Sequence, residues 1–495
     1  MEAVSEKKVQ TASPEMAEKF KQTVHDAARR FRQIPESETI RYVSHLDADG
    51  LSSAAIIVRT LIRENRKYCL SIVPQLTEEV AVQLAAESYT CYLFTDLGTG
   101  QFGLLKKHLS ARGKSVFILD HHHIQDEFEA EGMVHVNPHL AGIESSREIS
   151  GAGVSYLFSK ALDGKNSDLA HIALVGAIGD MQEDRGFSGF NREILEDAKA
   201  SGMIKVITGL RLFGVQTKPL HKVLEYSSEY PIPGVTGSES AAIQFLLQLG
   251  ILPKAGNGWR KLTDLTDEEL VKLATGVVMQ RIENKEPDEI IGPVYILKHE
   301  AEGSPLRDAK EFATLLNACG RLDKASAGIG ACLGDGKCRE EALRTLDDYK
   351  HHISNSLTWY ENALKQKGAG SGAIILDNGV TIINAEENVL PTMIGTLASI
   401  LSKSRNFSPG TFVLSLARAE DNFTKISMRL AGEKSVKGRF NLTEMLTAIA
   451  ERVGGQAGGH HEAAGALIKT EKEEEFIAIA REYLAQRRIE ERVAS

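Results

Sequence analysis

Short apolar runs alternate with stretches of helical periodicity from residue 41 to residue 136. The apolar runs cover 41–46, 70–74, 90–95, 115–119 and 133–136. Apolar residues with helical spacing fill 50–65, 76–87 and 101–111 between them, and further helices are predicted at 15–33, 151–163 and 168–182. Short bounded strands separated by helices are typical of βαβ units. The pattern therefore predicts an α/β fold built on a parallel sheet.

The pattern changes twice after this region. Helical stretches interrupted by prolines and turns indicate a mainly helical insertion from about 190 to 340. The longest helical pattern, 338–366, ends in the glycine-rich joint 368–372, beyond which strands and helices alternate again. The predicted segments are an N-terminal helix and tail (1–38), a first α/β domain (39–190), the insertion (191–337), a connecting helix and linker (338–372) and a second, smaller α/β domain (373–495).

Composition agrees with several globular domains. The chain has 495 residues, of which 42% are hydrophobic and 25% charged, as in ordinary folded proteins. Its net charge of −9 means that the average surface repels nucleic acid, so any such partner would need a local basic groove.

The sequence also bears on location and redox chemistry. It contains no apolar run of the roughly 18 residues that span a bilayer, and its charged N-terminus lacks the apolar core of a signal peptide. We therefore expect a cytoplasmic protein without a membrane partner. Five cysteines without a C-x-x-C pair argue against a disulfide framework and against a zinc ribbon.

Carboxylates and imidazoles follow the predicted strands at the ends where open parallel sheets bind ligands. The first strand ends in His45-Leu46-Asp47-Ala48-Asp49-Gly50, the third in Asp96-Leu97-Gly98 and the fourth in Asp120-His121-His122-His123, and a helix leads into Gly179-Asp180. Asp and Gly in such places are also ordinary cap and turn residues. Three adjacent histidines behind a buried strand have no obvious packing purpose, however, so the four segments together indicate a site.

This set of side chains has the chemistry of a two-ion centre. Carboxylates and imidazoles without thiols suit Mn²⁺ or Mg²⁺, and a bridging carboxylate holds two such ions about 3.5–4 Å apart. A metal pair lowers the pKa of a shared water and neutralises charge on a phosphoryl oxygen. Phosphoester hydrolysis is the natural use of such a site.

These motifs resemble a known family. Asp47-x-Asp49-Gly50, Asp96, Asp120-His121-His122 and Gly179-Asp180 match, in order and approximate spacing, the four motifs of the DHH phosphoesterases. Residues 454–465 resemble the G-G-H…A-A-G loop of the DHH-associated second domain, and 425–429 resemble its S-x-R strand. The S-H-L-D-A-D-G opening and residues 315–320 look most like the archaeal RecJ-like nucleases, including those associated with the GINS replication complex.

The resemblance implies a role for individual residues of the first domain. The implied ligands of two Mn²⁺ or Mg²⁺ ions are Asp47, Asp49, Asp96, His121 and Asp180, with Asp96 as the bridge. His45 stands where bacterial RecJ proteins have an aspartate and is a further candidate ligand. The implied catalytic residues are Asp120, which would orient an imidazole, and His122, which would contact the scissile phosphate. His123 is an additional histidine without an assigned role.

The second domain is expected to hold the nucleotide. Between Arg405 and Arg439 the sequence has seven basic side chains against three acidic ones. This segment is therefore positively charged, although the whole chain is negatively charged, and it could hold phosphates. A solvated strand face would explain the charges as well, and a tight turn would explain the glycines of 454–465. The candidate substrate-binding residues are Arg429, His460, Gly458, Gly459 and Arg418.

The resemblance favours a metal-dependent exonuclease that hydrolyses single-stranded DNA or RNA in replication or repair, with a GINS-type protein as a possible partner class. A phosphodiesterase of short oligonucleotides or cyclic dinucleotides is the first alternative. That branch of the family is usually shorter, so the insertion argues against it. The second alternative is a replisome scaffold, which the filled ligand positions argue against. Polarity and the choice between DNA and RNA stay open.

Overall fold

The computed structural model describes residues 12–124, 129–183, 185–365, 373–377, 379–404, 407–432 and 440–494, without the side chains of His460 and of 488–494. The glycine-rich joint predicted at 368–372 lies outside these residues. The chain forms two compact units, Met1–Leu346 and Asp347–Ser495. Among the described residues, none of the helices has the length and apolar character that crossing a membrane requires.

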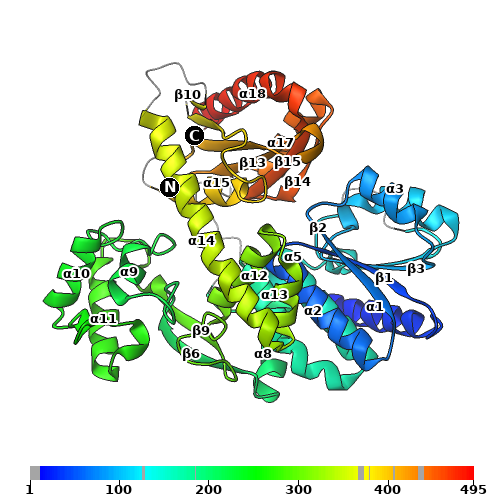
Figure 1. Ribbon diagram of the computed structural model, residues 1–495, viewed down its shortest axis with the longest axis horizontal. Helices are drawn as coiled ribbons and strands as arrows, with labels where there is room; N and C mark the ends of the chain where they lie inside the picture. Colours follow the sequence, from blue (N-terminus) through cyan, green and yellow to red (C-terminus); the bar gives the residue numbers. More distant parts are fainter. Residues whose placement is uncertain are drawn as a thin grey trace. The chain divides into compact units, whose positions relative to one another are not determined.

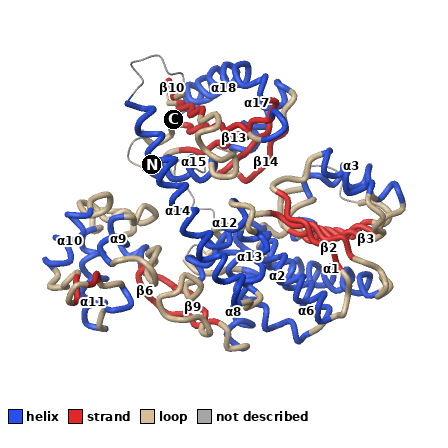
Figure 2. The backbone as a smooth tube through the Cα atoms, in the orientation of Figure 1, coloured by secondary structure: helices blue, strands red, loops and turns tan. Residues whose placement is uncertain are grey.

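A five-stranded sheet organises the first unit (Figures 1 and 2). Its order is β2-β1-β3-β4-β5, and each neighbouring pair is parallel. The strands are β1 (Ile40–His45), β2 (Tyr68–Val73), β3 (Cys91–Thr95), β4 (Ser115–Leu119) and β5 (Met133–Val136). They coincide with the five apolar runs, so the predicted α/β class with a parallel sheet is confirmed.

Helices cover both faces of this sheet, as the hydrophobic strands require. On one face α3 (Glu78–Ala86) and α4 (Phe102–His108) bury Val43, Phe94 and Ile118. On the other face lie α1 (Pro14–Arg32), α2 (Ala48–Arg63) and α6 (Gly151–Leu162), where Phe31 of α1 meets Phe117 of β4 at 5.4 Å between ring centroids. Behind α2 and α6 pack α7 (Ala170–Gly179) and α8 (Gly189–Ala200).

The insertion is mainly helical, as predicted, with α9 (Leu220–Glu225), α10 (Glu239–Gln248) and α11 (Asp267–Gln280) around a core of its own. It also contains strands that the pattern did not predict. An antiparallel ribbon joins β6 (Ile204–Leu210) to β9 (Ile291–Leu297), and a short hairpin joins β7 (Lys254–Ala255) to β8 (Gly258–Trp259). The long ribbon is half exposed, so its residues lack the continuous apolar run that identified the buried strands.

Two further helices of the insertion pack against the helices that cover the five-stranded sheet. α12 (Ala309–Arg321) packs against α7 and α2, and α13 (Ala325–Cys332) packs against α2. Gly320 of α12 approaches the Leu46 carbonyl so closely that a side chain has no space there. A segment more than 250 residues downstream thus supports the turn that follows β1.

The second unit contains a six-stranded sheet of order β10-β11-β12-β13-β15-β14. Its strands are β10 (Ile374–Asp377), β11 (Val380–Asn384), β12 (Phe412–Arg418), β13 (Phe423–Leu430), β14 (Gln456–His460) and β15 (Ala463–Lys469). Only β11 and β12 pair in parallel; the other described neighbours are antiparallel. The glycine-rich stretch that sequence analysis interpreted as a loop therefore includes an edge strand, β14, since its backbone pairs with β15.

Helices also cover this sheet on both faces. α17 (Leu442–Ala450) and α18 (Glu473–Ala494) bury Leu446, Phe476 and Leu484 against it, and α15 (Ile394–Lys403) packs on the opposite face of β12 and β13. The long helix α14 (Gly336–Lys365) begins in the first unit and continues into the second. It matches the predicted connecting helix.

Candidate active site

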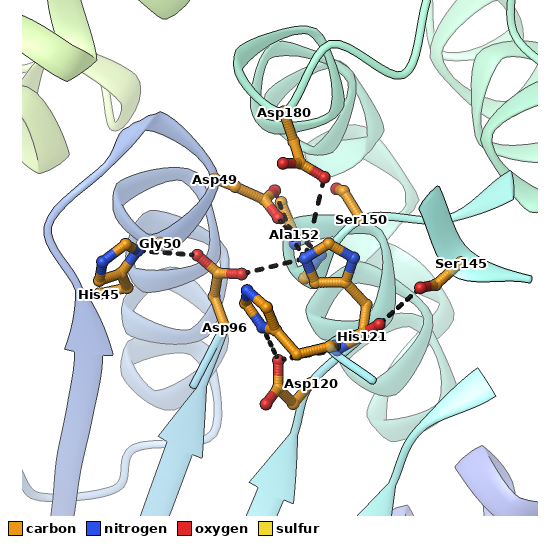
Figure 3. A network of polar contacts seen from close by, with 12 residues as sticks. His45, Asp49, Gly50, Asp96, Asp120, His121, Ser145, Ser150, Ala152 and Asp180 are labelled. Carbon is orange, nitrogen blue, oxygen red and sulfur yellow. Dashed lines mark hydrogen bonds and ion pairs between the residues drawn. The ribbon is translucent and has the colours of Figure 1, made fainter. Parts of the chain in front are cut away.

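The carboxyl ends of β1, β3 and β4 bring the predicted site residues of the first unit together (Figure 3). His45 ends β1, Asp96 follows β3, and Asp120 and His121 follow β4. The parallel register pairs Ser44 with Thr95 and Thr95 with Leu119, so the three strands end at the same level. Residues separated by about 75 positions in the chain thereby become neighbours.

Asp96 lies at the centre of this group. Asp96 adopts the left-handed backbone conformation (φ 57°), which turns the chain sharply after β3. Its side chain is 2% exposed. Asp96 Oδ1 lies 3.4 Å from His121 Nε2, and Asp96 Oδ2 lies 3.5 Å from His45 Nδ1. Gly151, the first residue of α6, touches it so closely that a Cβ there would lie 2.6 Å from Asp96 Oδ1.

Asp47 and Asp49 are placed by the start of α2. Asp47 is the N-cap, and its Oδ1 accepts a hydrogen bond from Gly50 N (3.0 Å) while its Oδ2 lies 3.1 Å from His45 Nδ1. Asp49, in the first turn, accepts hydrogen bonds from the backbone N–H groups of Gly151 (2.7 Å) and Ala152 (3.0 Å). Its carboxylate thus faces the positive end of α6, where a negative charge is stabilised.

His121 is surrounded by carboxylates from three directions. Its Nε2 lies 3.4 Å from Asp96 Oδ1, 3.7 Å from Asp49 Oδ2 and 3.8 Å from Asp180 Oδ2. Asp180 is the C-cap of α7, a helix that reaches the site through Gly176, where a Cβ would lie 2.5 Å from Asp49 Oδ1. The helix can approach this closely only because position 176 has no side chain.

Asp120 and His122 form a pair at the edge of this group. The fully buried Asp120 accepts hydrogen bonds on Oδ1 from His122 Nδ1 (2.7 Å) and His121 N (2.8 Å), and on Oδ2 from Thr99 N (2.9 Å). Burial opposes ionisation, but the charge and hydrogen bond of His122 outweigh it and hold the pKa of Asp120 well below its ordinary value. Asp120 thereby fixes the tautomer and orientation of His122.

The crowded carboxylates change each other's ionisation. Burial and then the charge of Asp96 raise the pKa of Asp49 well above its ordinary value. Burial favours neutral His121, but the hydrogen bond to Asp96 and the charges of Asp180 and Asp49 raise its pKa to about 10. A cation bound among the oxygens of these carboxylates would therefore offset their mutual repulsion.

The side chains fit two divalent cations. Ligand atoms within 4.8 Å of one another occur in the sets His45–Asp47–Asp96, Asp49–His121–Asp180 and Asp96–His121–His122. Asp96 belongs to sets on both sides of it, as a bridging carboxylate would. Among the described residues its buried Oδ2 has no hydrogen-bond partner, and an orphaned acceptor beside several hard oxygen donors suits a hard cation.

The predicted substrate-binding residues all belong to the second unit. The register aligns Arg429 of β13 with Ala463 of β15 and His460 of β14, and Ser427 with Gly465 and Gly458. Gly459, at φ 135°, meets the Ala463 carbonyl so closely that only glycine fits. Arg429, Gly458, Gly459 and the His460 backbone thus meet at one end of the sheet, and the His460 side chain lies outside the described residues.

Arg429 and Arg418 differ in surroundings. Arg429 donates hydrogen bonds to Ser399 Oγ (2.9 Å), Ser427 Oγ (3.0 Å) and the Met428 carbonyl (2.8 Å), which holds its guanidinium on the α15 face. Arg418 pairs instead with Thr424 near the other end of β13 and forms ion pairs with Glu386 and Glu473, both at 3.4 Å. The structure therefore does not bring Arg418 to the other four residues. Of the basic segment, Arg405, Lys434, Lys437 and Arg439 lie outside the described residues.

Sequence reasoning missed several residues that shape the site. Gly151 and Gly176 provide close approach, and Asn317 of α12 accepts a hydrogen bond from Ala48 N (3.1 Å) at the start of α2. Ser145 Oγ donates to the His121 carbonyl (2.5 Å) (Figure 3). Only Asn317 carried a sequence signal, as part of the 315–320 segment; the other three are small residues whose role depends on distant neighbours.

Known proteins share this sequence pattern and fold. The DHH family N-terminal domain matches residues 39–177, the DHH-CID domain 212–294 and the DHHA1 domain 377–486. An uncharacterized protein of Methanocaldococcus jannaschii is 31% identical over 445 residues, which cover 88% of this chain and 91% of the relative. A putative prophage-derived single-strand DNA-specific exonuclease of Bacillus subtilis is 27% identical over 148 residues, 28% of this chain and 25% of the relative.

Solved structures show the same fold at low identity. RecJ of Thermus thermophilus, crystallised with Mn²⁺, superimposes with a TM-score of 0.55 at 18% identity over 94% of this chain, which spans 55% of that protein. CDC45 of Entamoeba histolytica gives a TM-score of 0.59 at 11% identity, over 94% of this chain and 98% of CDC45. With the three domain matches and the strand-end motifs, these likenesses lead to one assignment: the chain belongs to the DHH family and has a RecJ-like phosphoesterase fold.

Proposed function

We propose that this protein is a metal-dependent exonuclease that hydrolyses the phosphodiester bonds of single-stranded DNA or RNA with two Mn²⁺ or Mg²⁺ ions, in replication or repair. The observation that supports it most is the position of Asp96, buried between two sets of ligand-type side chains. The Mn²⁺ bound to RecJ of Thermus thermophilus supports the choice of ion, and the name of the Bacillus relative supports the choice of substrate.

The candidate ligand sets define two metal positions. His45, Asp47 and Asp96 would hold one ion, and Asp49, His121 and Asp180 would hold the second, with Asp96 between the two sets. A pair of ions held there would supply Lewis-acid activation of an attacking water and charge neutralisation at the phosphoryl oxygens. The N-terminus of α6 and the buried backbone around Asp96 would keep the carboxylates fixed while substrate enters.

His122 would contact the scissile phosphate. Because Asp120 holds its Nδ1 at 2.7 Å, contact with the phosphate would fall to Nε2, where the imidazole can donate a proton to the leaving oxygen. Asp120 touches no substrate in this scheme and acts by orienting the ring.

The second unit would grip the nucleotide. Arg429 is already held in place by three hydrogen bonds, so little side-chain entropy would be lost when it binds a phosphate. Gly458 and Gly459 would let a phosphate or base approach the backbone of β14, and His460 follows them on the same strand.

The test is a nuclease assay with end-labelled single-stranded DNA and RNA in Mn²⁺. The diagnostic variant is Asp180→Asn, because Asp180 lies at a helix end and an amide oxygen there can still accept the hydrogen bond from Gln182 Nε2 (2.8 Å). The matched control is Asp347→Asn, an exposed carboxylate paired with Lys350 on α14. Release of mononucleotides from one end by the wild type and by Asp347→Asn, with at least a roughly hundredfold loss in Asp180→Asn, is the expected result.

The alternatives predict different products. Cleavage confined to substrates of two to four nucleotides or to cyclic dinucleotides would replace the proposal with a short-substrate phosphodiesterase. A replisome scaffold, suggested by the CDC45-like fold, predicts no cleavage together with stable co-elution with a GINS-type complex on size exclusion. The DHH-CID region offers exposed apolar side chains for such a partner, among them Leu252, Val271 and Met279.

A further inference from the structure

A second cluster of ligand-type side chains lies beside the candidate active site and is not used in the proposed reaction. His123 lies in the loop behind β4, His139 lies in the turn after β5, and Glu144 is the N-cap of α5 (Ser145–Glu148). One ligand atom from each lies within 4.8 Å of the other two. Three separate segments therefore place a nitrogen- and oxygen-donor set at one point.

The hydrogen bonds around His139 fix the tautomer of its ring. Its Nε2 lies 2.9 Å from Ser145 Oγ, whose own proton goes to the His121 carbonyl at 2.5 Å. The serine oxygen must therefore accept from the Nε2–H of His139, which puts the lone pair of the ring on Nδ1. Holding the remote ring nitrogen in this way fixes the tautomer and raises the basicity of the ligating nitrogen.

The other two members are also compatible with a bound cation. The rings of His123 and His139 stack with centroids 4.4 Å apart, and the Glu144 carboxylate, through Oε1, accepts a hydrogen bond from Ser146 N (3.0 Å).

We propose that His123, His139 and Glu144 bind one zinc-type transition-metal ion at a site separate from the two-ion centre. Two imidazoles and one carboxylate form a set that Zn²⁺ prefers, whereas Mn²⁺ and Mg²⁺ favour oxygen. Zinc binds nitrogen at about 2.0–2.1 Å, so ligand atoms in a tetrahedral site lie about 3.4 Å apart. In the structure the three ligand atoms lie within 4.8 Å of one another, so they would have to move closer together to bind zinc. His123 and Glu144 are exposed, so their side chains have room to move, and a water would complete four-fold coordination.

The experiment uses the full chain, stripped with a chelator, saturated with Mn²⁺ and then titrated with Co²⁺ as a spectroscopic substitute for zinc. The readouts are the visible absorption of four-coordinate Co²⁺ and the number of Co²⁺ ions retained per chain. The wild type should retain one Co²⁺ with this absorption. His123→Gln combined with Glu144→Gln should lose it, while His25→Gln, at an exposed histidine of α1, should keep it.

A second variant separates this site from the two-ion centre. Asp180→Asn should keep the Co²⁺ absorption, because Asp180 is not a member of the cluster. An unchanged spectrum and stoichiometry in the double variant would overturn the proposal, and so would loss of the absorption in Asp180→Asn. A wild type that shows the Co²⁺ signal but cleaves no nucleic acid would reject the proposed nuclease function and leave this site standing.

Discussion

At the scale of single residues, the candidate centre depends on two glycines without side chains as well as on the candidate ligands. Gly151 and Gly176 let two helices approach Asp96 and Asp49 to within van der Waals contact. Neither glycine has a positive φ, so close packing rather than backbone conformation requires them. They bring the α6 amides to Asp49 and the end of α7 to His121.

Gly176→Ala tests this close approach. A Cβ at position 176 would lie 2.5 Å from Asp49 Oδ1 and 2.6 Å from the Ala152 side chain, so α7 must shift, at a cost of about 1–3 kcal/mol in unfolding free energy. Mn²⁺ affinity should fall at the same time. Urea unfolding and Mn²⁺ titration measure both, with Gly164→Ala as the control because its Cβ would meet nothing within 4 Å. Equal behaviour of the two variants would show that the packing at position 176 is unimportant.

Asp120→Asn tests the positioning of His122. An amide retains the shape but weakens the bond to His122 Nδ1, so kcat with a single-stranded substrate should fall by about 10–100-fold. Because Asp120 belongs to none of the ligand sets, Mn²⁺ stoichiometry should be unchanged. A variant that loses its metal instead would place Asp120 among the groups that hold the ions. A KM that rises while kcat stays constant would also contradict the positioning role.

At the scale of elements, α12 supports the turn that carries the first motif. Asn317 accepts a hydrogen bond from Ala48 N, and Gly320 lies against the Leu46 carbonyl. The N-cap of the helix is Asp308, whose Oδ1 accepts from Lys310 N (2.9 Å) and Glu311 N (3.1 Å). Burial and the charge of Glu311 raise the pKa of this cap to about 7. The stability of α12 is therefore linked to pH.

The unfolding free energy should fall as the pH rises, because the folded protein holds the proton of Asp308 more tightly than the unfolded chain does. In the folded protein Asp308 keeps its proton up to about pH 7, whereas in the unfolded chain it loses it near the ordinary aspartate pKa of 3.8. Between these values the folded state binds more protons, so the unfolding free energy should fall by a few kcal/mol as pH rises from about 4 to 7. Asp308→Asn, which still caps the helix, should remove this part of the slope. Urea midpoints at several pH values provide the measurement, and identical slopes in both proteins would contradict the assignment.

At the scale of the whole molecule, the candidate metal centre belongs to the first unit, and the Arg429–Gly459 end of the sheet belongs to the second. Ligand binding to the folded state stabilises it by about 2.7 kcal/mol at a concentration of about 100 Kd. The stabilisation by bound Mn²⁺ should be confined to the first unit, which contains the candidate metal-binding side chains.

Hydrogen exchange with and without Mn²⁺ tests this localisation. Adding Mn²⁺ to the stripped protein should slow exchange in peptides from β1, β3 and β4 and from the start of α6, where the candidate ligands and their supporting amides lie. Peptides from β12, β13 and β15 should exchange at the same rate in both conditions. Protection that increases in the second unit and not in the first would place the ion elsewhere.

Much of the fold could be predicted because buried strands and helices carry their own period. The five strands of the first sheet were apolar runs bounded by turns, and the ligand candidates followed those runs directly. The β6–β9 ribbon and β14 were missed because their pairing depends on residues far along the chain, and because half-exposed or glycine-rich strands carry little periodicity.

The sequence by itself determined the order of strands and helices, the positions of carboxylates and imidazoles behind them, and the resemblance to the DHH family. Tertiary structure alone decided which atoms meet: that Asp49 receives the α6 amides, that Asn317 supports Ala48, that Arg418 is engaged by Glu386 and Glu473, and that His123, His139 and Glu144 converge. Local patterns follow from the period of each element, whereas these contacts join segments tens to hundreds of residues apart and exist only once the elements have packed.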